Sequence, residues 1–138
     1  MSVLPAKVIV NPVAGASSTR RKWPIISRLL NRIGLPFDFE YTEGVGHAIE
    51  LARLAASDGY RYLVAVGGDG TVNEVANGIL RSTNASTTAL GIVSTGTGSD
   101  FIRSVGISRD YTTACSALTG SRRPVSYTHL TLPTILLV

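Results

Sequence analysis

A glycine-rich turn with an acidic residue inside it is the part of this chain best suited to do chemistry. It covers residues 67–74, reads Gly-Gly-Asp-Gly-Thr-Val-Asn-Glu, and follows the apolar run Tyr62–Val66. Glycines let a backbone turn sharply and approach a ligand closely, because no Cβ blocks the approach. Amides exposed at such a turn, beside the start of a helix, suit a bound phosphate group. The turn therefore predicts a phosphate site.

Asp69, in the middle of this turn, adds chemistry that a phosphate cradle does not need. A carboxylate does not attract a phosphate directly. An acid at this place indicates either a divalent cation between the carboxylate and the phosphates or a proton acceptor for an attacking hydroxyl. We therefore expect a nucleotide phosphate site with metal-dependent chemistry.

Alternating strands and helices surround the turn. β-branched or alternating apolar residues predict strands, and apolar residues at helical spacing predict helices between them. The expected strands are Ala6–Val10, Phe37–Tyr41, Tyr62–Val66 and Ala89–Val93, and the expected helices are 20–33, 48–58, 72–80, 101–105 and 109–118. This alternation predicts an α/β fold in which helices cover both faces of a parallel sheet.

The loops that follow the four expected strands contain most of the chain's glycine and polar turn residues. In a parallel sheet, ligands bind at the edge formed by the carboxyl ends of the strands. The loops predicted at this edge are 11–15, 42–46, 67–71 and 94–100. Their coincidence is the strongest argument from the residues themselves for a binding site at this edge.

Composition is typical of a globular protein with one core. The chain has 138 residues, of which 44% are hydrophobic and 16% charged, below the usual charged share of about 25%. Its net charge is +4, with small basic clusters at 20–22 and 122–123. These clusters would attract anionic phosphates or a membrane surface, although a solvated face also explains so few charges. The absence of a long basic tract with interleaved aromatics argues against nucleic acid as a partner.

Cysteine content and hydropathy bear on the compartment. Cys115 is the only cysteine, so no intrachain disulfide can form and a reducing compartment is expected. No stretch reaches the roughly 20 apolar residues of a membrane span, and residues 1–10 do not have the pattern of a signal peptide. We expect a cytoplasmic protein with at most peripheral membrane contact.

The last residues of the chain differ from the rest. Residues 126–138 contain no charged side chain and resemble translated sequencing-adapter read-through, which would make them a non-native tail. An ordinary terminal strand is the alternative. Residues 123–125 are typical of the start of a strand, for which we expect no partner. The expected division is a nucleotide-binding domain at 1–125 and a non-native tail at 126–138, in a protein that is truncated.

Three motifs resemble the diacylglycerol kinase catalytic domain family in content and order. They are Asn11–Gly15, the run 67–74 and the turn 96–101. The resemblance covers about residues 7–125 and the N-terminal ATP-binding part only. It implies a Rossmann-like parallel-sheet domain of the NAD kinase and diacylglycerol kinase type, with the family's second, β-rich domain missing. The family contains bacterial lipid kinases and is related to sphingosine kinases and NAD kinases.

The resemblance also implies a function. The intact protein is expected to transfer the γ-phosphoryl group of ATP, with Mg²⁺, to a lipid hydroxyl such as that of diacylglycerol, giving phosphatidic acid. Asp69 is the implied catalytic residue and Mg²⁺ ligand. The implied ATP-binding residues are Asn11, Pro12, Val13, Ala14, Gly15, Thr42, Gly67, Gly68, Asp69, Gly70, Thr71, Val72, Asn73, Glu74 and Thr97. The implied partners are ATP and a lipid at the membrane surface, and homodimerisation is left open.

Two alternatives stay open at this point. An NAD kinase-like enzyme would use the same glycine-rich turn with a dinucleotide hydroxyl as acceptor, although the motifs at 11–15 and 96–101 match lipid kinases better. A non-catalytic nucleotide-binding module is the second alternative. Without the second domain, which in the family carries the lipid pocket and further acidic residues, this chain is expected to be inactive alone. A Rossmann dehydrogenase is disfavoured, because the glycine spacing differs and the motif follows the third strand.

Overall fold

Four parallel strands end in the loops predicted to form the site. The computed structural model describes residues 5–95 with their side chains, and residues 122–127 and 130–136 as backbone only. The strands are β1 (Ala6–Val10), β2 (Phe37–Tyr41), β3 (Tyr62–Gly67) and β4 (Ala89–Ser94). All four predicted strands are confirmed, and β3 and β4 are each one residue longer than expected. The helices predicted at 101–105 and 109–118 and the turn at 96–101 lie outside the described residues.

Three helices connect these strands. They are α1 (Ser18–Arg32), α2 (His47–Ser57) and α3 (Asp69–Leu80), and a single 3₁₀ turn, η1 (Ala85–Thr87), lies in the segment expected to be a loop. The helices begin earlier than predicted, α1 by two residues and α3 by three. For α3 the difference matters, because it places Asp69 and Gly70 in the first helical turn instead of in a loop.

The glycine-rich segment joins β3 to α3 without using positive φ. Gly68 is the N-cap of α3 with an extended backbone, φ −97° and ψ −167°, and Gly67, Gly68 and Gly70 are not among the residues with positive φ. The chain therefore passes from β3 into α3 without a left-handed residue. At Gly67 the requirement is space, since a Cβ there would lie 2.4 Å from Thr71 Oγ1.

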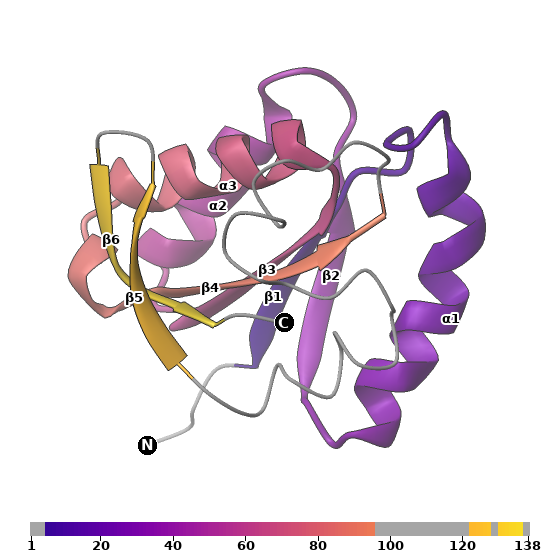
Figure 1. Ribbon diagram of the computed structural model, residues 1–138. Coiled ribbons are helices and arrows are strands. Elements are labelled where there is room, and N and C mark those ends of the chain that lie inside the picture. The colour runs from indigo at the N-terminus through magenta and orange to yellow at the C-terminus, as the bar shows by residue number, and fades with distance from the viewer. Residues whose placement is uncertain (1–4, 96–121, 128–129, 137–138) are drawn as a thin grey trace.

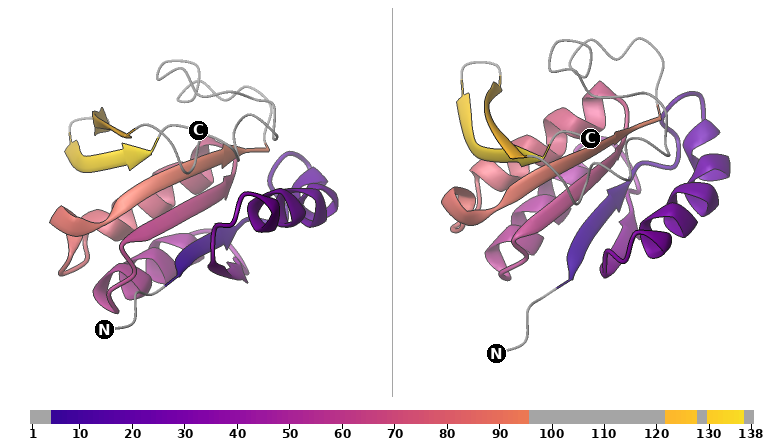
Figure 2. Two further views of the ribbon diagram at one scale, coloured as in Figure 1. Left: turned by 90° about the horizontal axis from the view of Figure 1, so that it is seen from below. Right: turned by 60° about the horizontal axis from the view of Figure 1, so that its bottom comes forward.

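The sheet has the order β2-β1-β3-β4-β6-β5, and β1 to β4 run parallel. The chain moves from β1 to β2 in one direction along the sheet and from β2 through β3 to β4 in the other. Because parallel crossovers are right-handed, α1 covers one face while α2 and α3 cover the other. Figure 1 shows α2 and α3 side by side behind the strands, and Figure 2 shows α1 on the opposite side. The predicted α/β fold with helices on both faces is confirmed.

Two further strands extend the sheet beyond β4. β5 (Arg122–Tyr127) pairs antiparallel with β6 (Leu130–Leu136), which pairs parallel with β4. The expectation that the strand starting at 123–125 has no partner is therefore wrong, because Arg123 pairs with Ile135 in the β5–β6 ladder. That residues 126–138 form a non-native tail stays a prediction.

The core is built from strands that are apolar on both faces. In β1, β3 and β4 nearly every side chain is buried, as expected for central strands of a parallel sheet covered by helices. β2 lies at the sheet edge, and its residues are exposed apart from the half-buried Phe37. Its aromatic residues face α1, where the ring of Trp23 lies 6.0 Å from that of Phe37 and 5.0 Å from that of Phe39. Among the described residues, no helix has the length and apolar character needed to cross a membrane.

Gly78 brings α3 into close contact with α2. A Cβ at this position would lie 2.3 Å from Ile49 O and 2.6 Å from Ala52 Cβ. The first of these atoms belongs to the backbone of α2 and cannot rotate away. The spacing of the two helices therefore depends on the absence of a side chain at Gly78.

We predict that Gly78→Ala lowers the free energy of unfolding by about 1–3 kcal/mol, the usual effect of forcing an extra carbon into a packed contact. Gly70→Ala is the matched control in the same helix, because nothing lies within 4 Å of a Cβ at Gly70. The control should be at least as stable as the starting protein. Urea unfolding followed by the fluorescence of Trp23 measures both, and equal midpoints for the two variants would contradict the prediction.

Candidate functional site

Three backbone hydrogen bonds align the loops at the carboxyl edge of the sheet. Thr42 N donates to Val10 O, Asn11 N donates to Val66 O, and Thr95 N donates to Gly67 O, each at 2.9 Å. In each bond the donor is the first residue after one strand, and the acceptor is the last or the last but one residue of the neighbouring strand. The loops after β1, β2 and β4 therefore begin at one edge of the sheet, where β3 also ends. Thr97, in the remainder of the loop after β4, lies outside the described residues.

Asn11 connects the loop after β1 to the start of α3. Its Nδ2 donates to Thr71 Oγ1 at 3.1 Å, and its Oδ1 accepts from Val13 N at 3.1 Å. The second bond is the short-range contact by which asparagine stabilises a turn after a strand. Both functional groups of the side chain are thus used to hold the loop and the helix together.

Glu74 connects α3 to the loop after β2. Its Oε1 accepts a hydrogen bond of 3.0 Å from Gly46 N, and Gly46 is the N-cap of α2 with a φ of +86°. A bond to a carboxylate is stronger than one between neutral groups. This contact holds the loop after β2 against α3.

Two adjoining cavities lie at this edge and share Asn11, Thr71 and Glu74 as walls. The first has a volume of about 540 Å³, and its lining residues are Asn11, Pro12, Val13, Arg20, Tyr41, Thr42, Glu43, Gly44, Val45, Ala48, Thr71 and Glu74. The second has a volume of about 400 Å³, and its lining residues are Asn11, Ala14, Gly15, Ala16, Gly68, Gly70, Thr71 and Glu74. Most of the residues predicted to bind ATP therefore meet at one place.

The second cavity is lined by small residues and backbone amides. Gly15, Ala16 and Ser17 have consecutive positive φ values of 61°, 56° and 70°. Positive φ costs a non-glycine residue about 1 kcal/mol or more, and such strain is typical of functional sites. Within residues 5–95, no hydrogen bond is formed by the amides of Gly15 and Ala16. Amides presented in this way are suited to bind an anion.

The first cavity has a different chemical character. Val13, Tyr41, Val45 and Ala48 give it apolar walls, and Arg20 with Glu43 adds charged groups at its rim. Apolar walls with a few polar groups are typical of sites that bind a flat organic ring system. The two cavities together offer an apolar compartment beside an amide-lined one, with the Asn11–Thr71 hydrogen bond between them.

Asp69 is the first residue of α3. Its Oδ1 is shielded from solvent, and its neighbours Gly68 and Gly70 line the second cavity, whereas Asp69 is not one of the lining residues. Among the described residues, no three His, Cys, Asp or Glu side chains form a metal cluster. Mg²⁺ is commonly held by one or two carboxylates together with substrate phosphates and water. Asp69 therefore lies beside the second cavity without lining it, and a metal ion at Asp69 stays a prediction.

Besides Asp69, three described residues predicted to bind ATP lie outside both cavities. Gly67 ends β3 and is buried, and Val72 is packed into the core at 1% exposure. Asn73 is exposed, and its backbone O accepts from Asn77 Nδ2 at 2.8 Å. The structure gives Gly67 and Val72 packing positions, so their effect on a ligand would act through the neighbours that they support.

Several residues that line the cavities were missed by the sequence analysis. They are Ala16, Arg20, Tyr41, Glu43, Gly44, Val45 and Ala48. The segment 42–46 was predicted to lie at the correct edge, so the end of the preceding strand and the residues beside Thr42 could have been included. Arg20 belongs to the basic cluster at 20–22, which was predicted to attract anionic groups but was not assigned to this edge of the sheet.

The fold and the arrangement of the loops match a known family. A model of the family described as the diacylglycerol kinase catalytic domain matches residues 5–130. Because this match covers most of the sequence, the chain belongs to the diacylglycerol kinase catalytic domain family. The resemblance stated from the three motifs is thereby confirmed.

Individual relatives agree with this assignment. A diacylglycerol kinase of Staphylococcus saprophyticus is 35% identical over 113 residues, which are 82% of this chain and 36% of the relative. One of Staphylococcus aureus is 37% identical over 105 residues, 76% of this chain and 33% of the relative. The crystal structure of a diacylglycerol kinase from Bacillus anthracis has a TM-score of 0.76 at 25% identity, covering 91% of this chain and 43% of its own. The chain thus spans about a third of the length of these curated relatives.

We predict that Glu74→Ala frees the loop after β2. Losing a hydrogen bond to a charged group should raise the hydrogen-exchange rate of the Gly46 amide by about tenfold or more. Asn73→Ala is the control, since Asn73 is the neighbouring α3 residue and its bonds run to Asn77. Amide exchange measured by NMR tests both variants. An unchanged rate at Gly46 in Glu74→Ala would show that this bond does not hold the loop.

Proposed function

We propose that this domain binds ATP as the phosphoryl donor of a lipid kinase. The observation that carries the proposal is the pair of cavities joined at Asn11, Thr71 and Glu74. The first is suited to the base and ribose because of its apolar walls, and the second to the phosphates because of its amides. Family membership supports a phosphoryl-transfer role for a site of this form.

The reaction that we propose is attack by a lipid hydroxyl, such as that of diacylglycerol, on the γ-phosphorus of ATP. The new O–P bond forms as the bond to ADP breaks, and the hydroxyl proton passes to a base, giving phosphatidic acid. Such transfer depends mainly on positioning and on neutralisation of phosphate charge. In this proposal the amides of Gly15, Ala16 and Gly70 orient the phosphates, and Asp69 would hold Mg²⁺, which would supply positive charge against the phosphates.

The acceptor site belongs to another part of the enzyme in this proposal. The chain spans about a third of the length of its curated relatives. We therefore place the lipid pocket and the proton acceptor in the portion of the relatives that this chain does not match. It follows that the chain alone should bind nucleotide without phosphorylating lipid.

Nucleotide binding by the 138-residue chain is the direct test. We predict that Gly70→Glu weakens ATP–Mg²⁺ binding about tenfold or more, because it places a negative charge beside the bound phosphates. The fold should tolerate the change, since nothing lies within 4 Å of a Cβ at Gly70. Asn73→Glu is the matched control, with the same added charge one helical turn away on an exposed position. Isothermal titration calorimetry measures the affinity of both variants for ATP–Mg²⁺. Equal affinities would show that the phosphates do not bind in the second cavity.

The role of Asp69 is tested in an enzyme that also contains the acceptor domain. We predict that Asp69→Asn lowers kcat by about 100-fold or more, the usual range for loss of a group that stabilises transition-state charge. ATP affinity should change much less. Transfer of labelled γ-phosphate to diacylglycerol in mixed micelles measures turnover. Near-normal turnover would exclude Asp69 from the mechanism while leaving the nucleotide site intact.

A further inference from the structure

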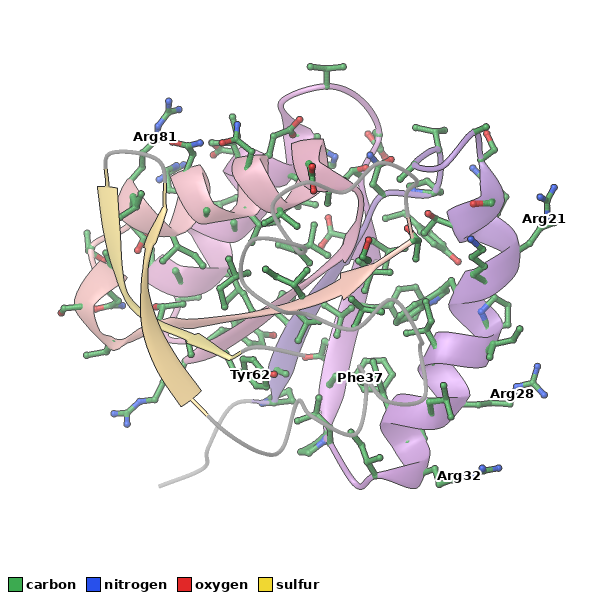
Figure 3. All side chains as sticks on the ribbon, in the orientation of Figure 1. Arg21, Arg28, Arg32, Phe37, Tyr62 and Arg81 are labelled. Carbon is green, nitrogen blue, oxygen red and sulfur yellow. The ribbon has the colours of Figure 1, made fainter. Side chains whose placement is uncertain are left out.

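One polar residue lies in the otherwise apolar inner row of α1. The buried residues of this helix are spaced at i, i+4, i+7 and i+11, so they share one side of it. They are Thr19, Trp23, Ile26 and Leu30. Figure 3 shows Arg21, Arg28 and Arg32 projecting away from the body of the protein instead. Because a buried hydroxyl costs free energy unless it forms hydrogen bonds, the partners of Thr19 distinguish it from the apolar residue that packing alone would favour.

Thr19 is the middle member of a short chain of hydrogen bonds. Its Oγ1 donates to Ala14 O at 3.1 Å and also forms a hydrogen bond with Thr95 Oγ1. A hydroxyl has one proton to donate, so Thr95 Oγ1 is the donor in the second bond. The chain thus runs from the residue directly after β4, through Thr19, to a carbonyl in the loop after β1. Successive hydrogen bonds of this kind polarise and strengthen one another.

The carbonyl of Ala14 belongs to the same peptide unit as the amide of Gly15. In a planar trans peptide unit the N–H points in the direction opposite to the C=O, so the group that holds Ala14 O also sets the direction of the Gly15 N–H. Thr19 holds this carbonyl twice, through Oγ1 and through its backbone N at 3.3 Å. Gly15 lines the second cavity and has a positive φ of 61°. The hydroxyl of Thr19 therefore helps to orient an amide at the wall of this cavity.

We propose that Thr19 and Thr95 are positioning residues, which aim the Gly15 amide into the second cavity so that it donates to a nucleotide phosphate. Neither threonine lines a cavity, so both act through the loop after β1. This role rests on the proposed function and adds to it the residues that orient a phosphate-binding amide. Without the Thr19 hydroxyl, only the backbone N of Thr19 would hold Ala14 O, and the left-handed loop would relax toward an unstrained conformation.

The experiment is isothermal titration calorimetry of the 138-residue chain and its variants with ATP–Mg²⁺. Thr19→Val removes the hydroxyl and keeps the branched shape of the side chain. This variant should bind ATP–Mg²⁺ about tenfold or more weakly, the usual effect of losing a hydrogen bond to a charged group. Thr19→Ser keeps the hydroxyl and should bind nearly as tightly as the starting chain.

Thr88→Val is the matched control. Thr88 is also a buried threonine whose Oγ1 donates to a backbone carbonyl, that of Asn84 at 2.9 Å, but it precedes β4 at the opposite edge of the sheet. Its loss should lower the free energy of unfolding, measured with urea, and leave the affinity for ATP–Mg²⁺ unchanged. The double variant Thr19→Val with Thr95→Val replaces both partners of a buried bond by apolar groups, which limits the loss of stability. It should nevertheless bind ATP–Mg²⁺ as weakly as Thr19→Val.

NMR separates an effect on the phosphates from a general loss of binding. In the starting chain the amide proton of Gly15 should move downfield when ATP–Mg²⁺ is added, because the amide gains a charged acceptor. In Thr19→Val this shift should be lost at saturating ATP–Mg²⁺. The amide of Gly44, which lines the first cavity, should respond to ATP–Mg²⁺ in both proteins.

Three results would overturn the proposal. These are equal affinities of Thr19→Val and the starting chain for ATP–Mg²⁺, an equal loss of affinity in Thr88→Val, or a downfield shift of the Gly15 amide that persists in Thr19→Val. A starting chain that does not bind ATP–Mg²⁺ would instead contradict the proposed function, so the two failures are distinguishable.

Discussion

Hydrogen bonds across the ends of the parallel strands are the constraint on which the rest of the site depends. Bonds of 2.9 Å from Thr42, Asn11 and Thr95 to the neighbouring strand ends set where three loops leave the sheet. Parallel pairing fixes these positions, because a slip of one residue would exchange the two faces of a strand. Strands that are buried on both faces resist such a slip only through the fit of their side chains. The packing of β1, β3 and β4 therefore also positions the residues at their ends.

α3 also fixes the position of the loop after β2, through its contacts with α2. Glu74 and Gly78 lie one turn apart on the side of α3 that faces α2. Gly78 lets the helices approach closely at Ile49 and Ala52, and the same approach brings the N-cap of α2 within 3.0 Å of the Glu74 carboxylate. The close packing at Gly78 thus helps to determine the hydrogen bond between Gly46 N and Glu74, a residue that lines both cavities. For this reason the residues that shape the site extend beyond those that line it.

The sequence was sufficient to predict the strands and the edge at which the site forms. Alternating or continuous apolar runs determine strands strongly, so β1 and β2 were predicted with their observed bounds. Helix starts were harder, since Gly68 caps α3 through its backbone conformation and without a side-chain bond. The partner of the segment at 123–125 could not be predicted, because it comes from the chargeless tail, which was set aside as non-native. The hydrogen bond between Glu74 and Gly46 joins residues 28 positions apart and follows from helix packing alone.

The strained loop at Gly15, Ala16 and Ser17 depends on contacts made by the first turn of α1. Left-handed residues persist only where their surroundings hold them. Here Thr19 stabilises the loop, because its N and Oγ1 both donate to Ala14 O. Its Oγ1 also forms a hydrogen bond with Thr95 Oγ1, directly after β4. Thr19 belongs to the first turn of α1, which is fixed to the core through Trp23, Ile26 and Leu30. The packing of α1 therefore also holds Gly15 and Ala16 in place at the wall of the second cavity.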